Sequence, residues 1–447
     1  MIIALSFIGL LVLISVLVNV TVVQNFLVSK ITNSLSEKLH TEVTIRHVDF
    51  KLFDKFTLKG TYIGDQQHDT LLYAGKLTVN VTNFFFFKNK TYLRYVGLDN
   101  ATVNLRRLPG DSVWNYQFIL DALSPSSPSP PGSPPPNLDI KKVVLNHIRI
   151  NKLDAWSGED THISADKIVL DARNIDLRRR KADIRSIQLD HPLFALVKYP
   201  STRPASDTVS GASPSPAEEK TKTDSLQWNT DHWALQVDDI TIDNGGFTLI
   251  DREESQVAEN FDPQHMVFYE VNATLKNTHL VRDSIITDLN LTTRERSGLQ
   301  VKKLSCRFKI SPVEMAFANL DLRINRSHIT DYFAMQFSDF DDLGDFVKKV
   351  DMRASFKDAE ISSDDIALFA PALADWKKEI KIKGQAYGNL SNLTGNNMDI
   401  QAGTSTELQG HIKLRGLPDI NNTFIDFQAQ KLVTNGKDIQ RFAPGLQ

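Results

Sequence analysis

The sequence predicts a mainly β protein, in which an N-terminal transmembrane helix precedes an elongated, curled antiparallel β-sheet. This sheet is an open groove built from repeats, with a few short helices. Three observations predict the class. Residues 1–23 contain no charged side chain. Most of the remaining chain alternates apolar and polar residues with a period of two, which is typical of strands that bury one face. A short apolar template also recurs about every 48 residues, which indicates an array of similar units.

The first element is the apolar run Met1–Val23. At about 1.5 Å per residue, a helix of this length spans a hydrocarbon core of about 30 Å, so we expect an uncleaved transmembrane anchor. A cleaved signal peptide is the alternative, but it requires a shorter apolar core and a cleavage site of small residues, which Val18–Val22 does not provide. No basic residue precedes the run, so we expect the natural start to lie upstream of Met1.

An amphipathic helix is expected over residues 24–40. Four apolar residues recur there at every fourth position among polar ones: Leu27, Ile31, Leu35 and Leu39. This spacing places them on one face of a helix, which we expect to lie over the start of the sheet. Packing against the protein core and contact with the membrane surface both remain open for this face.

Two stretches rich in Pro, Ser and charge interrupt the β pattern. Because they lack a hydrophobic periodicity, we expect both to be disordered, either as linkers between domains or as loops that leave one continuous sheet. The predicted organisation after the anchor and the helix is a first β-repeat unit at 41–123, a Pro/Ser-rich insert at 124–137, a second β-repeat unit at 138–200, a polar insert at 201–226, and further β-repeat units at 227–447. Short helices are expected near 328–347 and 362–376.

The repeated template reads apolar-x-x-apolar-x-[Leu/Ile]-[Asp/Asn]. Its copies start at Leu93, Ile140, Ile184 and Val237, which are 47, 44 and 53 residues apart. Alternating apolar residues on both sides of an Asp or Asn predict either two strands or one bulged strand, because the short polar side chain suits a local turn.

Two further repeats support an array. The stretches at 74–79 and 165–170 match each other, and each lies at the same spacing before a template copy. The motif Asp-Ile-x-x-Phe-Ala-Pro occurs at 365–371 and again, 73 residues later, at 438–444. The second copy breaks off shortly afterwards at Gln447, so we expect the natural chain to continue.

A long meander of strands with one apolar and one polar face has to hide the apolar face. It does so by closing into a barrel, packing as a sandwich or curling into a groove. The repeat period and the long inserts favour the curled sheet, whose units contact only their neighbours. An apolar face left uncovered by protein needs an apolar ligand, and acyl chains are the expected ligand beside a membrane anchor. The residues predicted to line the groove are Leu77, Val79, Val96, Leu98, Val103, Leu105, Ile168, Leu170, Ile187, Leu189, Phe194, Ile240, Ile242 and Phe247.

Two short runs are candidates for contact with the membrane. Four consecutive aromatic residues, which place rings on both faces of a strand, are Phe84, Phe85, Phe86 and Phe87. Two of them are expected to bury against the amphipathic helix, and the outer pair is the candidate membrane-surface contact. The basic run Arg178–Lys181 predicts a solvated hairpin turn, with contact to a lipid headgroup as the alternative.

Composition and motifs argue against an enzyme. The formal net charge is -3, so no global field favours nucleic acid as a partner. The single cysteine, Cys306, is predicted to be a small half-buried hydrophobe, and so few cysteines in an exported chain favour a bacterial periplasm. The 11 histidines show no zinc-site spacing, and no phosphate-binding loop or nucleophile elbow is present.

The densest acidic cluster, residues 339–345, lacks the pattern of an EF-hand and is predicted to be a solvated helix face rather than a calcium site. No catalytic residue, cofactor or metal ligand is therefore predicted. A hydrolytic enzyme would need a carboxylate pair that the sequence does not reveal.

The order of these features resembles the N-terminal region of AsmA-like proteins, a group that includes the TamB-type envelope proteins. The resemblance rests on the anchor, the amphipathic helix, the stretch Thr41–Phe53 and the later Trp114-Asn115-Tyr-Gln-Phe118-Ile119, and more loosely on the Asp-Ile-x-x-Phe-Ala-Pro motif. It implies a single-pass anchor in the bacterial inner membrane and a periplasmic β-groove of the bridge-like lipid-transfer kind. It further implies a role in carrying phospholipid to, or assembling, the outer membrane.

The implied partners are phospholipid, the inner membrane and outer-membrane assembly proteins. The alternative is a structural or partner-binding scaffold for outer-membrane assembly that conducts no lipid. Sequence beyond Gln447 would separate an AsmA-like from a TamB-type protein.

Overall fold

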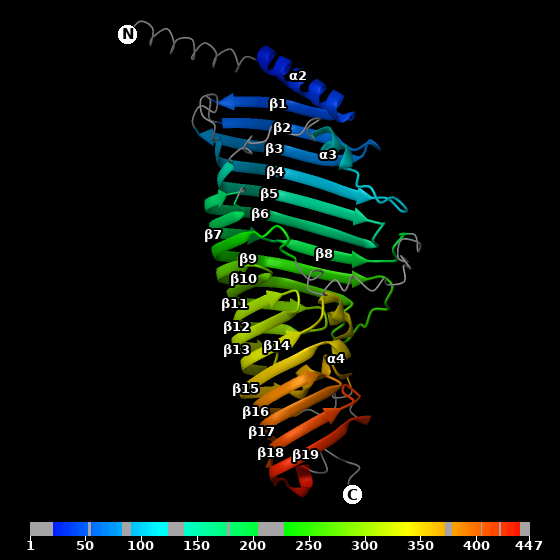
Figure 1. The fold of residues 1–447 in the computed structure, drawn as a ribbon, viewed down its shortest axis with the longest axis vertical. Coiled ribbons are helices and arrows are strands. Elements are labelled where there is room, and N and C mark those ends of the chain that lie inside the picture. The colour runs from blue at the N-terminus through cyan, green and yellow to red at the C-terminus, as the bar shows by residue number, and fades with distance from the viewer. Residues whose placement is uncertain are drawn as a thin grey trace, which may run out of the picture. The chain divides into compact units, whose positions relative to one another are not determined.

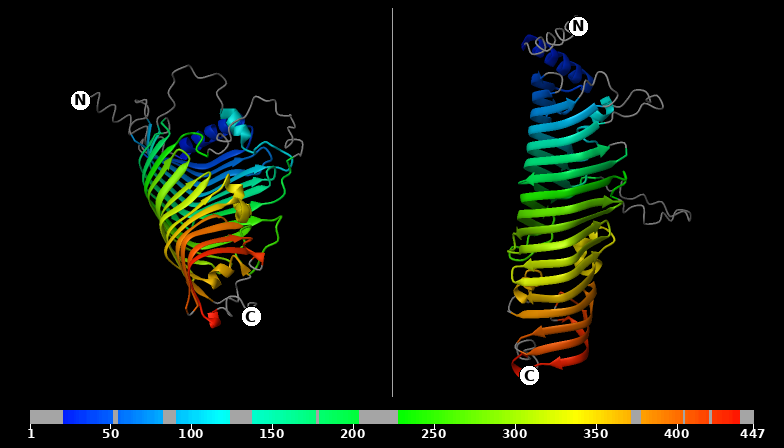
Figure 2. Two further views of the ribbon diagram at one scale, coloured as in Figure 1. Left: turned by 60° about the horizontal axis from the view of Figure 1, so that its bottom comes forward. Right: turned by 90° about the vertical axis from the view of Figure 1, so that its left-hand side faces the viewer.

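In the computed structural model the chain forms two compact units. Unit 1 comprises residues 1–213 with 249–253, and unit 2 comprises residues 214–248 with 254–447. Figures 1 and 2 show each unit as a curled sheet of long strands with few helices. The structure describes residues 21–51, 55–82, 91–123, 138–176, 179–203, 228–371, 378–403, 405–419 and 422–438.

Unit 1 pairs its strands in the order β1-β2-β3-β4-β5-β6, and both β7 and β8 pair with β6. Its elements are α2 (Thr21–Leu39), β1 (Val43–Lys51), β2 (Lys55–Gly64), β3 (Thr70–Thr82), β4 (Thr91–Arg107), α3 (Gln117–Leu123), β5 (Leu138–Asp154), β6 (Glu159–Asp176), β7 (Lys181–Asp190) and β8 (Leu193–Lys198).

Unit 2 holds most of β9 and the strands up to β19, and each strand from β10 onward pairs antiparallel with the next. Its strands are β9 (Ala234–Asp251), β10 (His265–Val281), β11 (Ser284–Glu295), β12 (Gln300–Ser311), β13 (Glu314–Ile324), β14 (Ser327–Gln336), β15 (Asp351–Ser362), β16 (Glu379–Asn389), β17 (Asn392–Ala402), β18 (Thr406–Arg415) and β19 (Phe424–Val433). Its helices are η3 (Phe340–Asp345), α4 (Phe346–Lys349) and α5 (Ser363–Ala367).

Helix α2 packs against β1, where the expected amphipathic helix meets the sheet. Leu39 is buried, and the backbone N–H of Val43 donates to the Ser36 hydroxyl at 3.0 Å. The first 20 residues of the expected anchor lie outside the described residues. Among the residues that are described, no helix is both long and apolar enough to cross a membrane.

One strand pair corrects the expected antiparallel meander. β4 and β5 run parallel, with Leu98 opposite Leu145 and Asp99 opposite Asn146. The segment between them carries α3 and the first insert, and a connection of this length returns the chain to the side where β4 begins. Opposed positions differ by 47 residues, which is the spacing of the first two template copies. These copies therefore lie side by side in register.

The helices of the second half are shorter than expected. The start of the helix predicted near 328–347 is strand β14, in which Phe333 and Met335 lie opposite Phe317 and Met315 of β13. Phe333 and Met335 therefore share one face of a strand, and the helical structure of this segment is confined to η3 and α4. Of the helix predicted near 362–376, α5 forms the start, and residues 372–377 lie outside the described ones.

The strands of unit 1 are kinked near their middle by residues in the left-handed conformation. Gly60, Asn100, His147 and His191 have φ angles of 61°, 53°, 50° and 47°; we call these four the kink row. Asn100 and His147 directly follow the Asp or Asn of a template copy within a continuous strand, and the strand pairing keeps its register there, so the left-handed residue kinks the strand without a bulge. At His191 the break separates β7 from β8 along β6. The template therefore gives two strands at His191, whereas at Asn100 and His147 one strand continues through a kink without the expected bulge.

Replacing Asn100 by Val should destabilise unit 1 by about 1–2 kcal/mol, because a β-branched residue is strained at positive φ. Asn100→Gly is the matched control and should keep the stability of the wild type, since glycine adopts this conformation without strain. Thermal unfolding of the two variants measures the difference. Equal melting temperatures for Val and Gly would contradict the assignment of the kink to this backbone conformation.

Candidate functional site

One face of unit 1 is built from apolar rows that cross the strands. Each residue of a row lies directly opposite the next. The first row is Val48, Leu58, Leu77, Leu98, Leu145, Ile168 and Leu189; the second is Phe56, Val79, Val96, Val143, Leu170 and Ile187; the third, beyond the kink row, is Val43, Ile63, Leu72, Val103, Ile150, Ile163 and Phe194. We call this surface the apolar face of unit 1.

The kink keeps the rows on one face. Three buried residues, Ala74, Ala101 and Ile148, pack against partly buried side chains from both sides of the kink: Leu72, Leu98, Leu145 and Ile150. The large side chains of the first row after Val48 stay half-buried, and Ile163 in the third row is 38% exposed. An apolar ligand bound on this face would therefore bury more apolar surface, which stabilises the complex by about 25 cal/mol for each Å² removed from water.

All groove-lining candidates of unit 1 lie on the apolar face. Ten belong to the three rows, and Leu105 follows Val103 by two residues in β4, so it points to the same side. The remaining candidates, Ile240, Ile242 and Phe247, are half-buried in β9, and the Phe247 ring lies 6.3 Å from that of Phe268 in β10. That these residues line a groove for a ligand stays a prediction.

Unit 2 carries apolar rows that the template does not reveal. One row passes through Ile285, Ile310, Met315, Met335 and Met352. Its neighbour passes through Phe308, Phe317 and Phe333, whose successive ring centroids are 5.1 and 6.2 Å apart. Each strand shows the period of two in sequence, but which residues meet across strands depends on register.

The opposite face of unit 1 carries a ladder of charged and amide groups. Lys59, Lys76, Asp99, Asn146, Lys167 and Asp190 lie opposite one another in turn. Asp99 accepts a hydrogen bond from the Asn146 amide at 2.5 Å and pairs with Lys76 at 3.2 Å. The bond from Asn146, aided by Lys76 and opposed by burial, lowers the pKa of Asp99. The template thus places its Leu on the apolar face and its Asp or Asn on the polar one.

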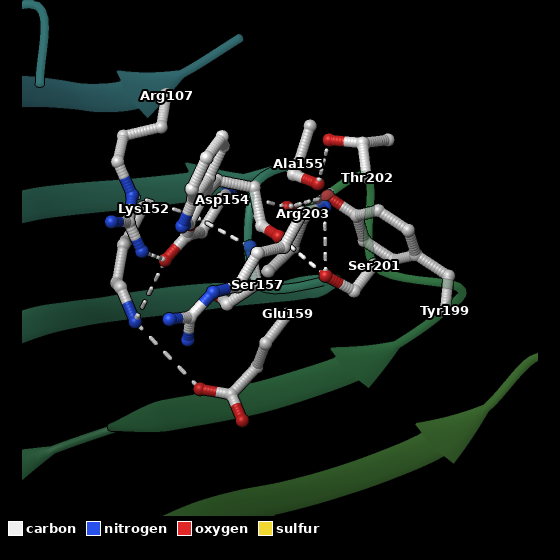
Figure 3. A network of polar contacts seen from close by, with 12 residues as sticks. Arg107, Lys152, Asp154, Ala155, Ser157, Glu159, Tyr199, Ser201, Thr202 and Arg203 are labelled. Carbon is white, nitrogen blue, oxygen red and sulfur yellow. Dashed lines mark hydrogen bonds and ion pairs between the residues drawn. The ribbon is translucent and has the colours of Figure 1, made fainter. Parts of the chain in front are cut away.

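A buried ion pair fixes the strand ends of unit 1 (Figure 3). Nε and Nη2 of Arg107 donate to the two carboxylate oxygens of Asp154 at 2.8 and 2.6 Å, and Ser157 N–H adds a third bond. Asp154 is 1% exposed. Burial alone would raise the pKa of Asp154, but the bonds from Arg107 and Ser157 outweigh it and lower the pKa. With both oxygens engaged, Asp154 is a structural anchor rather than a free acid or base.

The same network ties the β5–β6 turn to the end of β8 (Figure 3). The Tyr199 hydroxyl donates to Asp160 at 2.7 Å, and burial together with this bond raises the pKa of Tyr199 to about 12. Asp160 also accepts the backbone N–H of Asp154 at 2.9 Å. Gly158 has a φ of 75°, and a Cβ there would lie 2.1 Å from the Tyr199 carbonyl oxygen. Only glycine fits this turn.

The Trp114-Asn115 motif holds the segment after β4 against the β2–β3 turn. Asn115 accepts the backbone N–H of Arg106 at 2.9 Å and donates to Asp65 at 3.0 Å. The Arg107 guanidinium lies 4.6 Å from the Trp114 ring centroid. A surface pocket of about 250 Å³ next to this motif is lined by polar and apolar side chains, including those of Arg106 and Trp114. These contacts give the motif a structural role in positioning α3.

The remaining chemical candidates are accounted for by packing. Cys306 is buried opposite Leu289, and burial raises the pKa of its thiol to about 11. In the acidic cluster, Asp342 is buried rather than solvated, because it accepts the Ser338 N–H at 2.8 Å and pairs with Lys349 at 3.2 Å. Among the described side chains, no group of three or more His, Cys, Asp or Glu could hold a metal ion.

The basic run contributes Arg179 and Arg180 to the turn between β6 and β7, as the hairpin prediction expects. The four phenylalanines at 84–87 and both inserts, apart from residues 201–203, lie outside the described residues. In comparisons with known proteins, no family model, no curated protein and no solved structure matches this chain.

Proposed function

We propose that this protein is a non-enzymatic, AsmA-like component of the bacterial cell envelope that shields lipid acyl chains on its apolar face. Residues 1–23 anchor it in the inner membrane as a single-pass helix, with the bulk of the chain in the periplasm. In this role it carries phospholipid to the outer membrane or supports outer-membrane assembly. The observation that carries the proposal is the uninterrupted apolar face of unit 1, whose large side chains stay half-buried.

The dimensions of this face suit an acyl chain. Neighbouring strands are about 4.8 Å apart, so the row from Val48 to Leu189 extends over roughly 29 Å. One acyl chain reaches across about half of a hydrocarbon core of roughly 30 Å. A whole chain therefore fits along a row, while the ladder of charged groups on the opposite face keeps the protein in water.

A photo-crosslinking amino acid at Leu189 should capture phospholipid in cells, and one at Leu98 should do the same. The matched control is Gln188, which is exposed, adjacent to Leu189 in β7 and on the opposite face. We expect lipid adducts at Leu98 and Leu189 and a background level at Gln188, read by mass spectrometry of the purified protein. No adduct at either leucine, or equal adducts at Gln188, would refute the proposal.

A scaffold that binds a protein partner is the second candidate, and strand β19 favours it. Within the described part of the chain β19 pairs only with β18, and Phe424, Ile425 and Leu432 are 62%, 60% and 57% exposed. An apolar strand with an unpaired edge can take up an added strand, either from a partner or from a continuation of the same chain. A crosslinker at Ile425 that captures one protein in a 1:1 ratio, with no lipid at Leu98 or Leu189, would favour the scaffold.

A further inference from the structure

The apolar face of unit 1 ends in a partly polar row at the ends of its strands. Every second residue of a strand points to the same side, so the row two residues beyond the third row belongs to the same face. This row passes through Leu105, Lys152, Thr161 and Leu196, each directly opposite the next. Strands β4 and β8 therefore continue the face with leucine, whereas β5 and β6 place an ammonium and a hydroxyl there. We call Lys152 and Thr161 the polar pair.

The polar pair has hydrogen-bonding groups that no described residue uses. Nζ of Lys152 lies 3.7 Å from Oε1 of Glu159 and 3.9 Å from Oδ2 of Asp154 (Figure 3), beyond the roughly 3.2 Å of an ordinary N–H···O bond. The Thr161 hydroxyl likewise makes no hydrogen bond within the described part of the chain. The Lys152 side chain is 35% exposed, so a ligand can reach its ammonium group.

The charges around the polar pair favour an anion. In the next row outward, Arg107 lies opposite Asp154 and binds both of its carboxylate oxygens. Glu159 lies opposite Lys198 in β8. Each of these carboxylates thus has another cation directly across from it, and the charge of Lys152 is in excess.

An aromatic ring borders the same place. Nζ of Lys152 lies 5.9 Å from the centroid of the Trp114 ring, and the Arg107 guanidinium lies 4.6 Å from it. Indole rings are favoured where an apolar surface meets a polar one, because the ring has an apolar body and a polar N–H group. Trp114 therefore suits the boundary between the acyl chains and the headgroup of a lipid.

We infer that the polar pair binds the phosphate group of a phospholipid whose acyl chains lie on the neighbouring apolar rows. The inference rests on the proposed function and deepens it, because it assigns the headgroup to one margin of the apolar face. The Lys152 ammonium supplies charge and N–H donors, and the Thr161 hydroxyl adds an O–H donor, which suits the anionic oxygens of a phosphodiester. Ile150 and Ile163, two residues further along the same strands, are roughly 7 Å away, so the chains start beside them.

The test replaces Lys152 by Gln in the full-length protein, which removes the charge and keeps a side chain of similar size. The probes are dioleoylphosphatidylglycerol and dioleoylglycerol, offered in equal amounts in mixed micelles. Both have the same chains, and only the first has a phosphate. Mass spectrometry of the purified protein gives the ratio of the two bound lipids. We expect Lys152→Gln to lower the share of the phospholipid about three- to tenfold, and Thr161→Val to lower it less.

Two matched variants serve as controls. Lys167→Gln removes the same charge from an exposed position on the opposite face of β6, and Lys152→Arg keeps the charge at the site. Both should keep a ratio close to that of the wild type. An unchanged ratio in Lys152→Gln, or an equal fall in Lys167→Gln, would overturn the inference. A wild type that binds neither lipid would overturn the proposed function itself, so the two failures are distinguishable.

A second readout separates a phospholipid from free phosphate and needs no substitution. N-hydroxysuccinimide acetate acetylates accessible lysine amines, and mass spectrometry reads the rate at each lysine. Bound dioleoylphosphatidylglycerol should slow acetylation of Lys152 at least about threefold and leave Lys167 unchanged. Inorganic phosphate at the same concentration should protect neither, because it has no chain to hold it on the apolar rows. Equal protection of Lys152 by inorganic phosphate would assign the site to a free anion and overturn the inference.

Discussion

Replacing Asp154 by Ala is expected to destabilise unit 1 by about 3–5 kcal/mol, because the change leaves the Arg107 guanidinium without its buried partner. Both side chains are largely shielded from water, and Arg107 gives both of its donated bonds in the network to this one carboxylate. The backbone N–H of Ser157 also loses its acceptor. Hydrogen exchange of the β4, β5 and β6 amides, followed by mass spectrometry on the whole protein, measures the loss as a lower free energy of opening.

An exposed ion pair in the same unit provides the matched control. Arg185 also binds one carboxylate through two nitrogens, donating to Asp171 at 3.3 and 2.5 Å, but both side chains are open to solvent. Water screens such a pair, so Asp171→Ala should leave the free energy of opening nearly unchanged. Equal effects of Asp154→Ala and Asp171→Ala would show that burial does not set the strength of these pairs.

The loss of stability of unit 1 at low pH should depend on the protonation of Asp154. The pKa of Asp154 is lowered in the folded protein, so its stabilising effect is complete above the unfolded value near 3.9 and is lost as the pH falls through the folded pKa. The wild type should therefore lose stability below about pH 4, whereas Asp154→Ala should lose less over that window. Parallel pH profiles for the two proteins would contradict the assignment.

Local sequence patterns determine which residues of unit 1 share a face. The template alternates Val96 and Leu98 with polar neighbours and ends in Asp99, and these features alone predict a strand that is interrupted at one point. The structure adds that the following residue, Asn100, is left-handed, and that this restores the apolar face beyond the interruption. Asn and His tolerate this conformation better than most residues, so their recurrence after Asp or Asn is a signal that the sequence does contain.

The local patterns do not predict contacts between residues that lie far apart in the sequence. The parallel pairing of β4 with β5 depends on the path of the intervening segment, whose composition predicts only irregular structure. The contact between Arg107 and Asp154 joins residues 47 positions apart, and the local sequence around either residue does not indicate that the two are paired. Likewise, Met315, Met335 and Met352 occupy ordinary strand positions, and only the register of three strands brings them together.

Replacing Asp365 by Ala should destabilise unit 2 by about 3–4 kcal/mol, because three donors lose their acceptor at a buried position. One carboxylate oxygen of Asp365 accepts the backbone N–H groups of Arg326 and Ser327 and the Ser327 hydroxyl, at 3.0, 2.7 and 2.6 Å. The Ser327 hydroxyl in turn accepts the backbone N–H of Ser362 at 2.9 Å. Hydrogen exchange should therefore accelerate at the start of β14 and the end of β15 while the amides of unit 1 keep their rates.

The neighbouring Asp364→Ala is the control, since Asp364 carries the same charge in the same helix but meets the guanidinium of Arg326 at the surface, at 3.1 Å. It should leave the exchange rates of β14 nearly unchanged. Similar acceleration by both substitutions would mean that the charge, and not the three hydrogen bonds, holds the strand start.

Asp365 begins the first copy of the Asp-Ile-x-x-Phe-Ala-Pro motif, and Asp438 begins the second. Replacing Asp438 by Ala should also destabilise unit 2, because Asp438 likewise accepts a backbone N–H and a hydroxyl from two consecutive residues at the start of a strand. Asp438 is fully buried and accepts the backbone N–H of Ser405 and the hydroxyl of Thr406, each at 3.0 Å, at the start of β18. In both copies the aspartate follows one strand of the sheet and accepts hydrogen bonds from the start of the strand before it. Asp438→Ala should therefore loosen β18 and β19 and spare β14. If it left β18 as protected as in the wild type, the sequence repeat would not correspond to a repeated structural clamp.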